Sequence, residues 1–219
     1  LDLAVGQVAP PVWLGGAEPR PVGAPYKRDR AGVPLPNQVV SLSLRSPDEV
    51  GNKEFEYRAD LTEISIPDSV TSIGEGAFRG CTSLVAVTIP DSVTTIGLRA
   101  FEGCTSLEVV TIGKSVTAIG NGTFYGCGKL TDVAIPDSVT TIGDGAFSGC
   151  SSLANITIGN SVATIGEKAF HDCTSLAAVT IPDSVTTIGL GAFDGCSSLT
   201  DVTIGNSVTT IGERAFYGC

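Results

Sequence analysis

The sequence predicts a repeat solenoid of the α/β class, in which short strands alternate with short helical turns. A strict period of 23 residues places a cysteine at the same point of seven units: Cys81, Cys104, Cys127, Cys150, Cys173, Cys196 and Cys219. A phenylalanine recurs with the same period at Phe78, Phe101, Phe124, Phe147, Phe170, Phe193 and Phe216. A glycine does so at Gly74, Gly97, Gly120, Gly143, Gly166, Gly189 and Gly212. One such unit cannot bury its apolar face alone, so units that share a period fold as stacked coils.

The first half of each unit predicts a strand and a turn. From Leu61 onward the unit reads L-x-x-I/V-x-I-P/G-x-S-V-x-x-I-G-x-x-A-F-x-G-C-x-x. In "LTEISIP" the apolar residues Ile64 and Ile66 are separated by one polar residue, which is the period of a strand. "PDSV" then predicts a turn, in which Pro67 fixes φ and Asp68 bonds the local backbone as an Asx-turn.

The second half of the unit predicts another short strand and a compact turn. "VTSIG" is a β-like segment, and we expect Gly74 to end it with a positive φ. "EGAFRGC" is too short for a full helix and favours a single helical or 3₁₀ turn.

The chain divides into three regions. Residues 1–38 contain seven prolines, which predict an extended arm or linker. Residues 61–219 hold the seven full units, and the last unit ends at Cys219 without a polar capping coil. We therefore expect further repeats, or a partner, to cover that end.

Residues 39–60 are a degenerate copy of the unit. The residues that we align with Leu61, Ile64 and Ile66 are Val39, Leu42 and Leu44. After one deleted residue, Val50, Gly51 and Phe55 occupy the Ile, Gly and Phe columns, and Arg58 occupies the cysteine column among other charged residues. We interpret this copy as an N-terminal capping repeat, because an end coil faces water on one side.

Charge and hydropathy exclude several classes of function. The formal net charge is −10, and residues 61–219 alone carry six basic and fifteen acidic groups. An acidic surface of this kind does not attract nucleic acid or anionic lipid. We find no apolar run as long as the roughly 20 residues of a membrane helix, and the first residues lack the pattern of a signal peptide.

The cysteines are expected to be structural. Equivalent residues of adjacent coils lie about 4.8 Å apart with parallel side chains, whereas a disulfide needs converging Cβ atoms at about 3.8 Å. A straight row of thiols also does not form the tetrahedral cluster that zinc prefers. We expect buried thiols that pack as small apolar groups.

The remaining polar residues give no enzyme site. The single histidine, His171, stands beside Asp172 in the variant turn "AFHDC", which we interpret as a surface substitution. One acid per coil, at Asp68, Asp91, Asp137 and Asp183, falls short of the oxygens that calcium requires, and Lys114, Asn160 and Asn206 interrupt the column. We therefore expect no enzyme, no cofactor and no metal.

The repeat resembles the BspA-like leucine-rich repeat, a class of 23 residues with the signature L-x-x-I-x-I-P-x-x-V-x-x-I-G-x-x-A-F-x-x-C. The match is close over residues 61–219 and weak over 39–60. The resemblance implies a right-handed leucine-rich repeat solenoid with short parallel strands on the concave face and the A-F-x-G-C turns on the convex face. It also implies a non-enzymatic, adhesin-like protein-interaction module, found on bacterial surfaces and in protists, and hence an extracellular or cell-surface location.

Two variable columns on the first strand predict a binding surface. They hold Thr62, Val85, Glu108, Thr131, Ala154, Ala177 and Thr200, and Glu63, Ala86, Val109, Asp132, Asn155, Ala178 and Asp201. Our partner-binding candidates on this surface are Glu63, Val85, Glu108, Val109, Asp132, Asn155 and Asp201. Candidates in the arm are Trp13, Leu14, Arg20, Tyr26, Lys27, Arg28 and Arg30.

Two alternatives to a recognition surface stay open. In one, the chain is a structural subunit of a larger assembly, with an organelle as the alternative location, and it docks through the arm and the open end of the solenoid. In the other, two threonine rows bind ice. These rows are Thr88, Thr111, Thr157, Thr180 and Thr203, and Thr94, Thr117, Thr140, Thr186 and Thr209. Threonine is also simply a good residue for an exposed strand.

Overall fold

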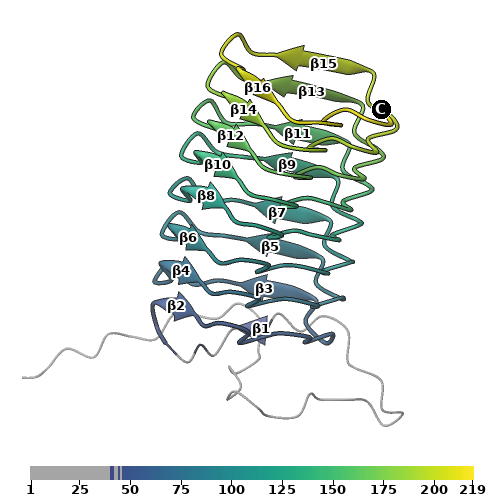
Figure 1. The fold of residues 1–219 in the computed structure, drawn as a ribbon. Coiled ribbons are helices and arrows are strands. Elements are labelled where there is room, and N and C mark those ends of the chain that lie inside the picture. The colour runs from purple at the N-terminus through teal and green to yellow at the C-terminus, as the bar shows by residue number, and fades with distance from the viewer. Residues whose placement is uncertain (1–39, 42–43, 45) are drawn as a thin grey trace, which may run out of the picture.

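The computed structural model describes residues 40–41, 44 and 46–219, and within them the chain forms a stack of coils (Figure 1). Each coil contributes two short strands. The first strands are β1 (Val40–Ser41), β3 (Glu63–Ser65), β5 (Ala86–Thr88), β7 (Val109–Thr111), β9 (Asp132–Ala134), β11 (Asn155–Thr157), β13 (Ala178–Ile181) and β15 (Asp201–Ile204). The second strands are β2 (Glu49–Val50), β4 (Ser72–Ile73), β6 (Thr95–Ile96), β8 (Ala118–Ile119), β10 (Thr141–Ile142), β12 (Thr164–Ile165), β14 (Thr187–Ile188) and β16 (Thr210–Ile211).

The strands form two parallel faces. We call the odd-numbered strands the first face, which runs β1-β3-β5-β7-β9-β11 and continues with the pair β13-β15. The even-numbered strands form the second face, in the groups β2-β4-β6 and β8-β10-β12-β14-β16. Glu63 pairs with Ala86, and Ser72 pairs with Thr95, which is the 23-residue register throughout the full units. The predicted in-register stacking and both predicted strands per unit are confirmed.

The core is built from the recurring apolar columns. Leu61, Val70, Ile73 and Phe78 are at most 1% exposed, as are most of their equivalents in later coils. The phenylalanines stack face to face from Phe55 to Phe216, with ring centroids 5.1–5.4 Å apart and planes within 14° of parallel. Burial of these apolar side chains is the main source of stability. No single coil encloses them, so the burial depends on the stacking of neighbouring coils.

The turns that contain the A-F-x-G-C motif are not helical, and this prediction is wrong. The described residues contain no helix, and the motif forms successive turns. Its N–H groups alternate in direction: those of Ala77 and Arg79 donate within the coil, to Gly74 and Gly76, whereas that of Phe78 donates to Ala100 of the next coil. A helix needs consecutive bonds of one kind.

Two positive-φ columns enforce this alternation. One lies two residues before each phenylalanine and the other two residues after it. The first holds Lys53, Gly76, Arg99, Gly122, Gly145, Lys168, Gly191 and Arg214, and the second holds Tyr57, Gly80, Gly103, Gly126, Gly149, Asp172, Gly195 and Gly218. A residue with left-handed φ interrupts a right-handed helix. The fold is therefore a parallel β-solenoid without a helical side.

The invariant glycine column has a different cause from the one expected. Gly74 and its equivalents do not have positive φ. Instead, a Cβ atom on Gly189 would lie 2.5 Å from the carbonyl carbon of Gly166, and one on Gly97 would lie 2.5 Å from that of Gly74. The column is glycine because adjacent coils approach backbone to backbone at this point.

The first coil follows the later ones in part. Val50 lies beside Ile73, and the ring of Phe55 stacks on that of Phe78, as aligned from the sequence. The alignment of the first strand is wrong, however, because Val40, not Leu42, pairs with Ile64. A capping role for residues 39–60 remains a prediction, and the arm of residues 1–38 lies outside the described residues.

Candidate binding surface

The cysteine row is sealed inside the stack. Cys81 to Cys196 are buried free thiols, and each donates to the carbonyl oxygen of a phenylalanine in the preceding coil, for example Cys150 Sγ to Phe124 O at 3.2 Å. Desolvation raises the pKa of Cys150 to about 12, so this thiol stays protonated at neutral pH. The predicted structural role is confirmed for these cysteines. Cys219, in the last coil of the sequence, is exposed.

The histidine lies on an exposed turn. His171 Nδ1 is 3.2 Å from Asp172 Oδ2, and Asp172 has the positive φ that glycine adopts in most other coils. The described residues contain no group of three or more His, Cys, Asp or Glu residues that could hold a metal ion.

The aspartate column connects coils rather than closing local turns, so the Asx-turn prediction is wrong. Asp91, Asp137 and Asp183 each accept a hydrogen bond from a backbone N–H 23 residues further on, at 2.7–2.8 Å. The donors belong to Lys114, Asn160 and Asn206, the residues that interrupt the column. The acid stabilises the stack by pairing a backbone group of its neighbour.

One threonine row is used in the same way. Hydroxyls of Thr94, Thr117, Thr140, Thr186 and Thr209 donate to carbonyl oxygens of the preceding coil at 3.2–3.4 Å. These donors are already occupied along the stack. The row therefore has a structural role, and ice binding remains an unsupported prediction.

The two variable columns lie on the outside of the first face. All seven candidates there, Glu63, Val85, Glu108, Val109, Asp132, Asn155 and Asp201, are exposed. Val85 and Val109 are apolar residues of adjacent coils that are 42% and 54% exposed, and the carbonyl of Val85 accepts from the N–H of both Glu108 and Val109. The structure thus places a small apolar centre next to acidic side chains. The arm candidates Trp13, Leu14, Arg20, Tyr26, Lys27, Arg28 and Arg30 lie outside the described residues.

A carboxylate–amide pair extends this surface toward the later coils. Asn155 Nδ2 donates to Asp132 Oδ1 at 2.6 Å, and this bond is the main reason why the pKa of Asp132 is lowered. The pair could have been found from the sequence, since the two residues are 23 apart in one column.

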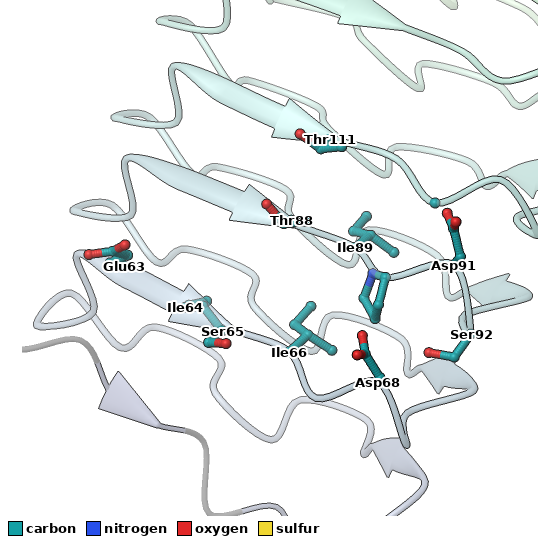
Figure 2. Close-up of a pocket in the computed structure, with 12 residues that line it drawn as sticks. Glu63, Ile64, Ser65, Ile66, Asp68, Thr88, Ile89, Asp91, Ser92 and Thr111 are labelled. Atoms are coloured by element: carbon teal, nitrogen blue, oxygen red, sulfur yellow. The ribbon is translucent and has the colours of Figure 1, made fainter. Parts of the chain in front are cut away.

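A hollow of about 820 Å³ opens where β3, β5 and β7 end (Figure 2). Its lining includes the buried residues Ile66, Ile89 and Pro90, the carboxylates of Asp68 and Asp91, and Glu63 at the start of β3. Nothing in the sequence analysis identified this hollow.

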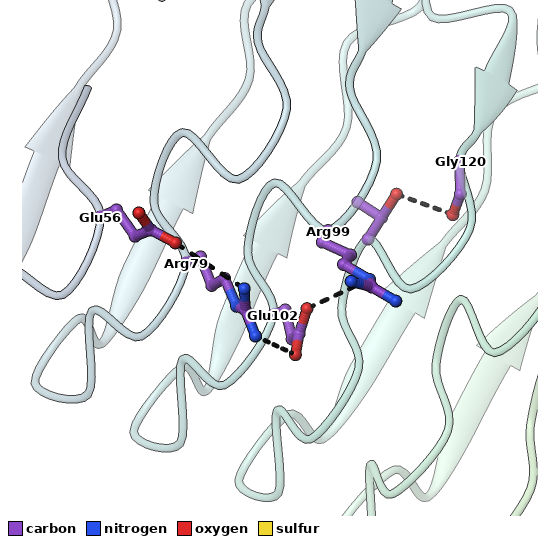
Figure 3. A network of polar contacts seen from close by, with 6 residues as sticks. Glu56, Arg79, Arg99, Glu102 and Gly120 are labelled. Carbon is purple, nitrogen blue, oxygen red and sulfur yellow. Dashed lines mark hydrogen bonds and ion pairs between the residues drawn. The ribbon is translucent and has the colours of Figure 1, made fainter. Parts of the chain in front are cut away.

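An ion-pair network on the turns was also missed. Arg79 lies between Glu56 and Glu102, at 3.7 and 3.2 Å, and Arg99 reaches Glu102 at 3.5 Å (Figure 3). Glu56, Arg79 and Glu102 occupy one column, so alternating charge at the 23-residue spacing was the available signal. The network links consecutive coils on a side of the molecule where ion pairs are partly exposed and individually weak.

These features define a repeat protein. Its buried columns hold the same residue types in nearly every coil, whereas the exposed columns of the first face vary from coil to coil. The chain belongs to the BspA-type leucine-rich repeat family, whose model matches residues 48–177 and 117–219. The family resemblance identified from the repeat signature is therefore confirmed. Comparison with curated proteins gave no match.

Solved structures of bacterial leucine-rich repeat proteins are similar. A leucine-rich cell surface protein from Faecalibacterium prausnitzii is 40% identical with a TM-score of 0.68, over 74% of this chain and 43% of that one. The leucine-rich repeat protein of T. pallidum is 37% identical with a TM-score of 0.65, over 73% of this chain and 74% of that one. A protein from Eubacterium ventriosum is 30% identical with a TM-score of 0.65, over 71% of this chain and 44% of that one. The chain thus spans less than half the length of the first and third of these proteins.

Proposed function

We propose that this chain is a non-enzymatic recognition module at a cell surface or outside the cell, and that it binds a protein through the outside of the first face. Leucine-rich repeat solenoids are typically protein-interaction modules. A cell-surface protein is among the similar structures, and this supports the proposed location. In the described residues, no helix has the length and hydropathy that crossing a membrane requires.

The observation that carries the proposal is the exposed pair Val85 and Val109 within columns that otherwise vary from coil to coil. The core valines Val87 and Val110 of the same two coils are buried, whereas Val85 and Val109 point outward, so core packing does not account for an apolar residue at either position. Glu108 precedes Val109 in the sequence. In the column of Val109, Asp132 stands in the next coil and Glu63 stands two coils before. A partner with an apolar contact surrounded by basic groups would complement this surface.

Charge substitution at the two valines tests the proposal. We expect the Val85→Asp/Val109→Asp variant to bind immobilised extracellular-matrix proteins, or whole host cells, at least about tenfold more weakly than the wild type. Leu190→Asp is the matched control, because Leu190 is as exposed as Val85, at 42%, but lies outside the first face. Equal binding by the double variant and the wild type would exclude the first face as the binding surface.

The alternative of a subunit that docks through its arm rests on residues outside the described ones and remains a prediction. Deleting residues 1–38 separates the two proposals. A surface-recognition module retains its binding without the arm, whereas an arm-docked subunit leaves its assembly.

A further inference from the structure

The column after the first strand sets how closely coils approach. It reads Pro67, Pro90, Gly113, Pro136, Gly159, Pro182 and Gly205. Proline and glycine alternate along the full units except at the first junction, where Pro90 follows Pro67. Proline has no N–H and carries a bulky ring, whereas glycine allows close backbone contact.

Junctions from a proline coil to a glycine coil are tight. A Cβ atom on Gly113, Gly159 or Gly205 would lie 2.3–2.5 Å from the carbonyl oxygen of the proline before it. The aspartates beside these prolines, Asp91, Asp137 and Asp183, make the inter-coil bonds described above.

Junctions from a glycine coil to a proline coil use a serine instead. Ser138 Oγ donates to Val116 O, and Ser184 Oγ donates to Val162 O, each at 2.7 Å. At both kinds of junction, a side chain therefore forms a hydrogen bond with the backbone of the adjacent coil.

The proline-to-proline junction makes neither bond. No described residue donates to the Asp68 carboxylate, although its equivalents in three later coils each accept an N–H. Ser92 Oγ is buried and has no hydrogen-bond partner, although the equivalent hydroxyls of Ser138 and Ser184 do. Both residues line the hollow of about 820 Å³, and Figure 2 shows them on its wall. A buried hydroxyl without a partner is costly, so this pattern indicates a place for a ligand.

The lining defines the chemistry of that ligand. Glu63, Asp68 and Asp91 provide negative charge, whereas Ile66 and Pro90 of the lining are buried. The described residues offer no cluster suited to a metal ion. An extended peptide with basic side chains fits this acidic lining.

We propose that the hollow binds residues 20–30 of this chain, the segment "RPVGAPYKRDR". It carries four basic groups and one acidic group, with two prolines. Val40, where β1 begins, lies ten positions after Arg30, and an extended chain of ten steps reaches about 33–36 Å. The step from β1 to β5 is only about 10 Å, two strand spacings. The tether is therefore long enough, and it holds the segment at high effective concentration.

The contact has a consequence for recognition. Glu63 belongs both to the hollow and to the proposed binding surface. A partner that contacts Glu63 therefore binds next to the hollow.

Carbodiimide cross-linking of the full-length protein locates the segment. This reagent joins an amine to a carboxylate in contact, and Lys27 is the only lysine before Lys53. We expect Lys27 to be joined to Glu63, Asp68 or Asp91 within one chain at low salt, and the yield to fall at least about threefold in 0.5 M NaCl, which screens the contact. Lys27 joined only to other carboxylates, or joined between two chains, would overturn the proposal.

Trypsin cleavage after Lys27, Arg28 and Arg30 provides a readout that does not depend on the cross-linked groups. We expect the Asp68→Asn/Asp91→Asn variant to be cut at these bonds at least about threefold faster than the wild type, because the docked segment is released. Asp137→Asn/Asp183→Asn is the matched control, since it changes the same column outside the hollow, and we expect it to be cut like the wild type. Equal rates in all three proteins, each with an unchanged unfolding temperature, would contradict the docking.

Discussion

The Sγ atom of Cys150 donates a hydrogen bond to the carbonyl oxygen of Phe124 at 3.2 Å, across the boundary between two coils. The same contact recurs from Cys81, paired with Phe55, to Cys219, paired with Phe193. The thiol thus has two functions: it fills space in the core, and it gives the Phe124 carbonyl a second donor beside the N–H of Cys127, which bonds the same oxygen at 3.1 Å within the turn. An alanine at this position would fill less space and could not donate the bond between coils.

Removing one of these thiols tests that role. We expect Cys150→Ala to lower the free energy of unfolding by about 1–2 kcal/mol, because the core loses a buried sulfur atom and the Phe124 carbonyl loses one of its two donors. Denaturation by guanidinium chloride, followed by circular dichroism, measures the change. Ser197→Ala is the control, at the exposed position that follows Cys196, and is expected to change stability by no more than about 0.5 kcal/mol. A Cys150→Ala protein as stable as the wild type would show that the thiol bond contributes nothing.

Alkaline pH should destabilise the protein through the same row. The pKa of Cys81, Cys150 and Cys196 is raised from 9.0 to about 12 by desolvation. A thiol with a raised folded-state pKa contributes its stability fully below the unfolded pKa and loses it as the pH rises toward the folded pKa. We expect the free energy of unfolding to fall between pH 9 and 12, by about 1.4 kcal/mol per pH unit for each buried thiol. A Cys81→Ala/Cys150→Ala variant should show a shallower slope, and an unchanged slope would contradict the assignment.

Alanine substitutions at two glycines of the invariant column, Gly189 and Gly120, should affect stability differently. Gly189→Ala places a methyl group 2.5 Å from the backbone of Gly166, so we expect a loss of about 1–3 kcal/mol. Gly120→Ala meets its nearest atom at 3.4 Å, so we expect a change from neutral to a gain of about 1 kcal/mol, because the unfolded chain loses freedom. Thermal unfolding of the two variants decides the matter. Equal losses would mean that backbone conformation, and not inter-coil contact, selects glycine.

The positive-φ column predicts a gain at a lysine. Lys168 adopts φ 51° where Gly145 adopts φ 59° in the preceding coil. We expect Lys168→Gly to stabilise the protein by about 0.5–1 kcal/mol by relieving left-handed strain, and Gly145→Ala to cost about 1 kcal/mol although its nearest neighbour is 3.8 Å away. Chemical denaturation of both variants measures the two effects. Opposite signs from those expected would exclude φ as the cause.

The sequence was sufficient for the repeat, for both strands of the full units and for the buried columns, because these depend on period and hydrophobicity alone. It was insufficient for the turns. Whether the N–H of Phe78 bonds within its coil or to the next one depends on φ at Gly76 and Gly80, and a non-glycine such as Arg99 adopts the same φ without any local signal.

The contacts between coils were also not predicted from the sequence. Asp91 was expected to close its own turn, but stacking brings the N–H of Lys114 within 2.8 Å of its carboxylate. Likewise, Val40 and not Leu42 pairs with Ile64, because the degenerate first strand lacks the apolar pattern that fixes register. The hollow at Pro90 follows from a break in the proline–glycine alternation, which is visible in the sequence only once the spatial role of that column is known.

Counting reactive thiols in the native protein tests the central claim, that in-register stacking seals the recurring residues inside. Six of the seven cysteines are buried and only Cys219 is exposed. We expect Ellman's reagent at pH 8 to modify one thiol per native chain and seven after unfolding in guanidinium chloride, with the fast site mapped to Cys219 by mass spectrometry. Rapid modification of several cysteines in the folded protein would contradict the sealed stack.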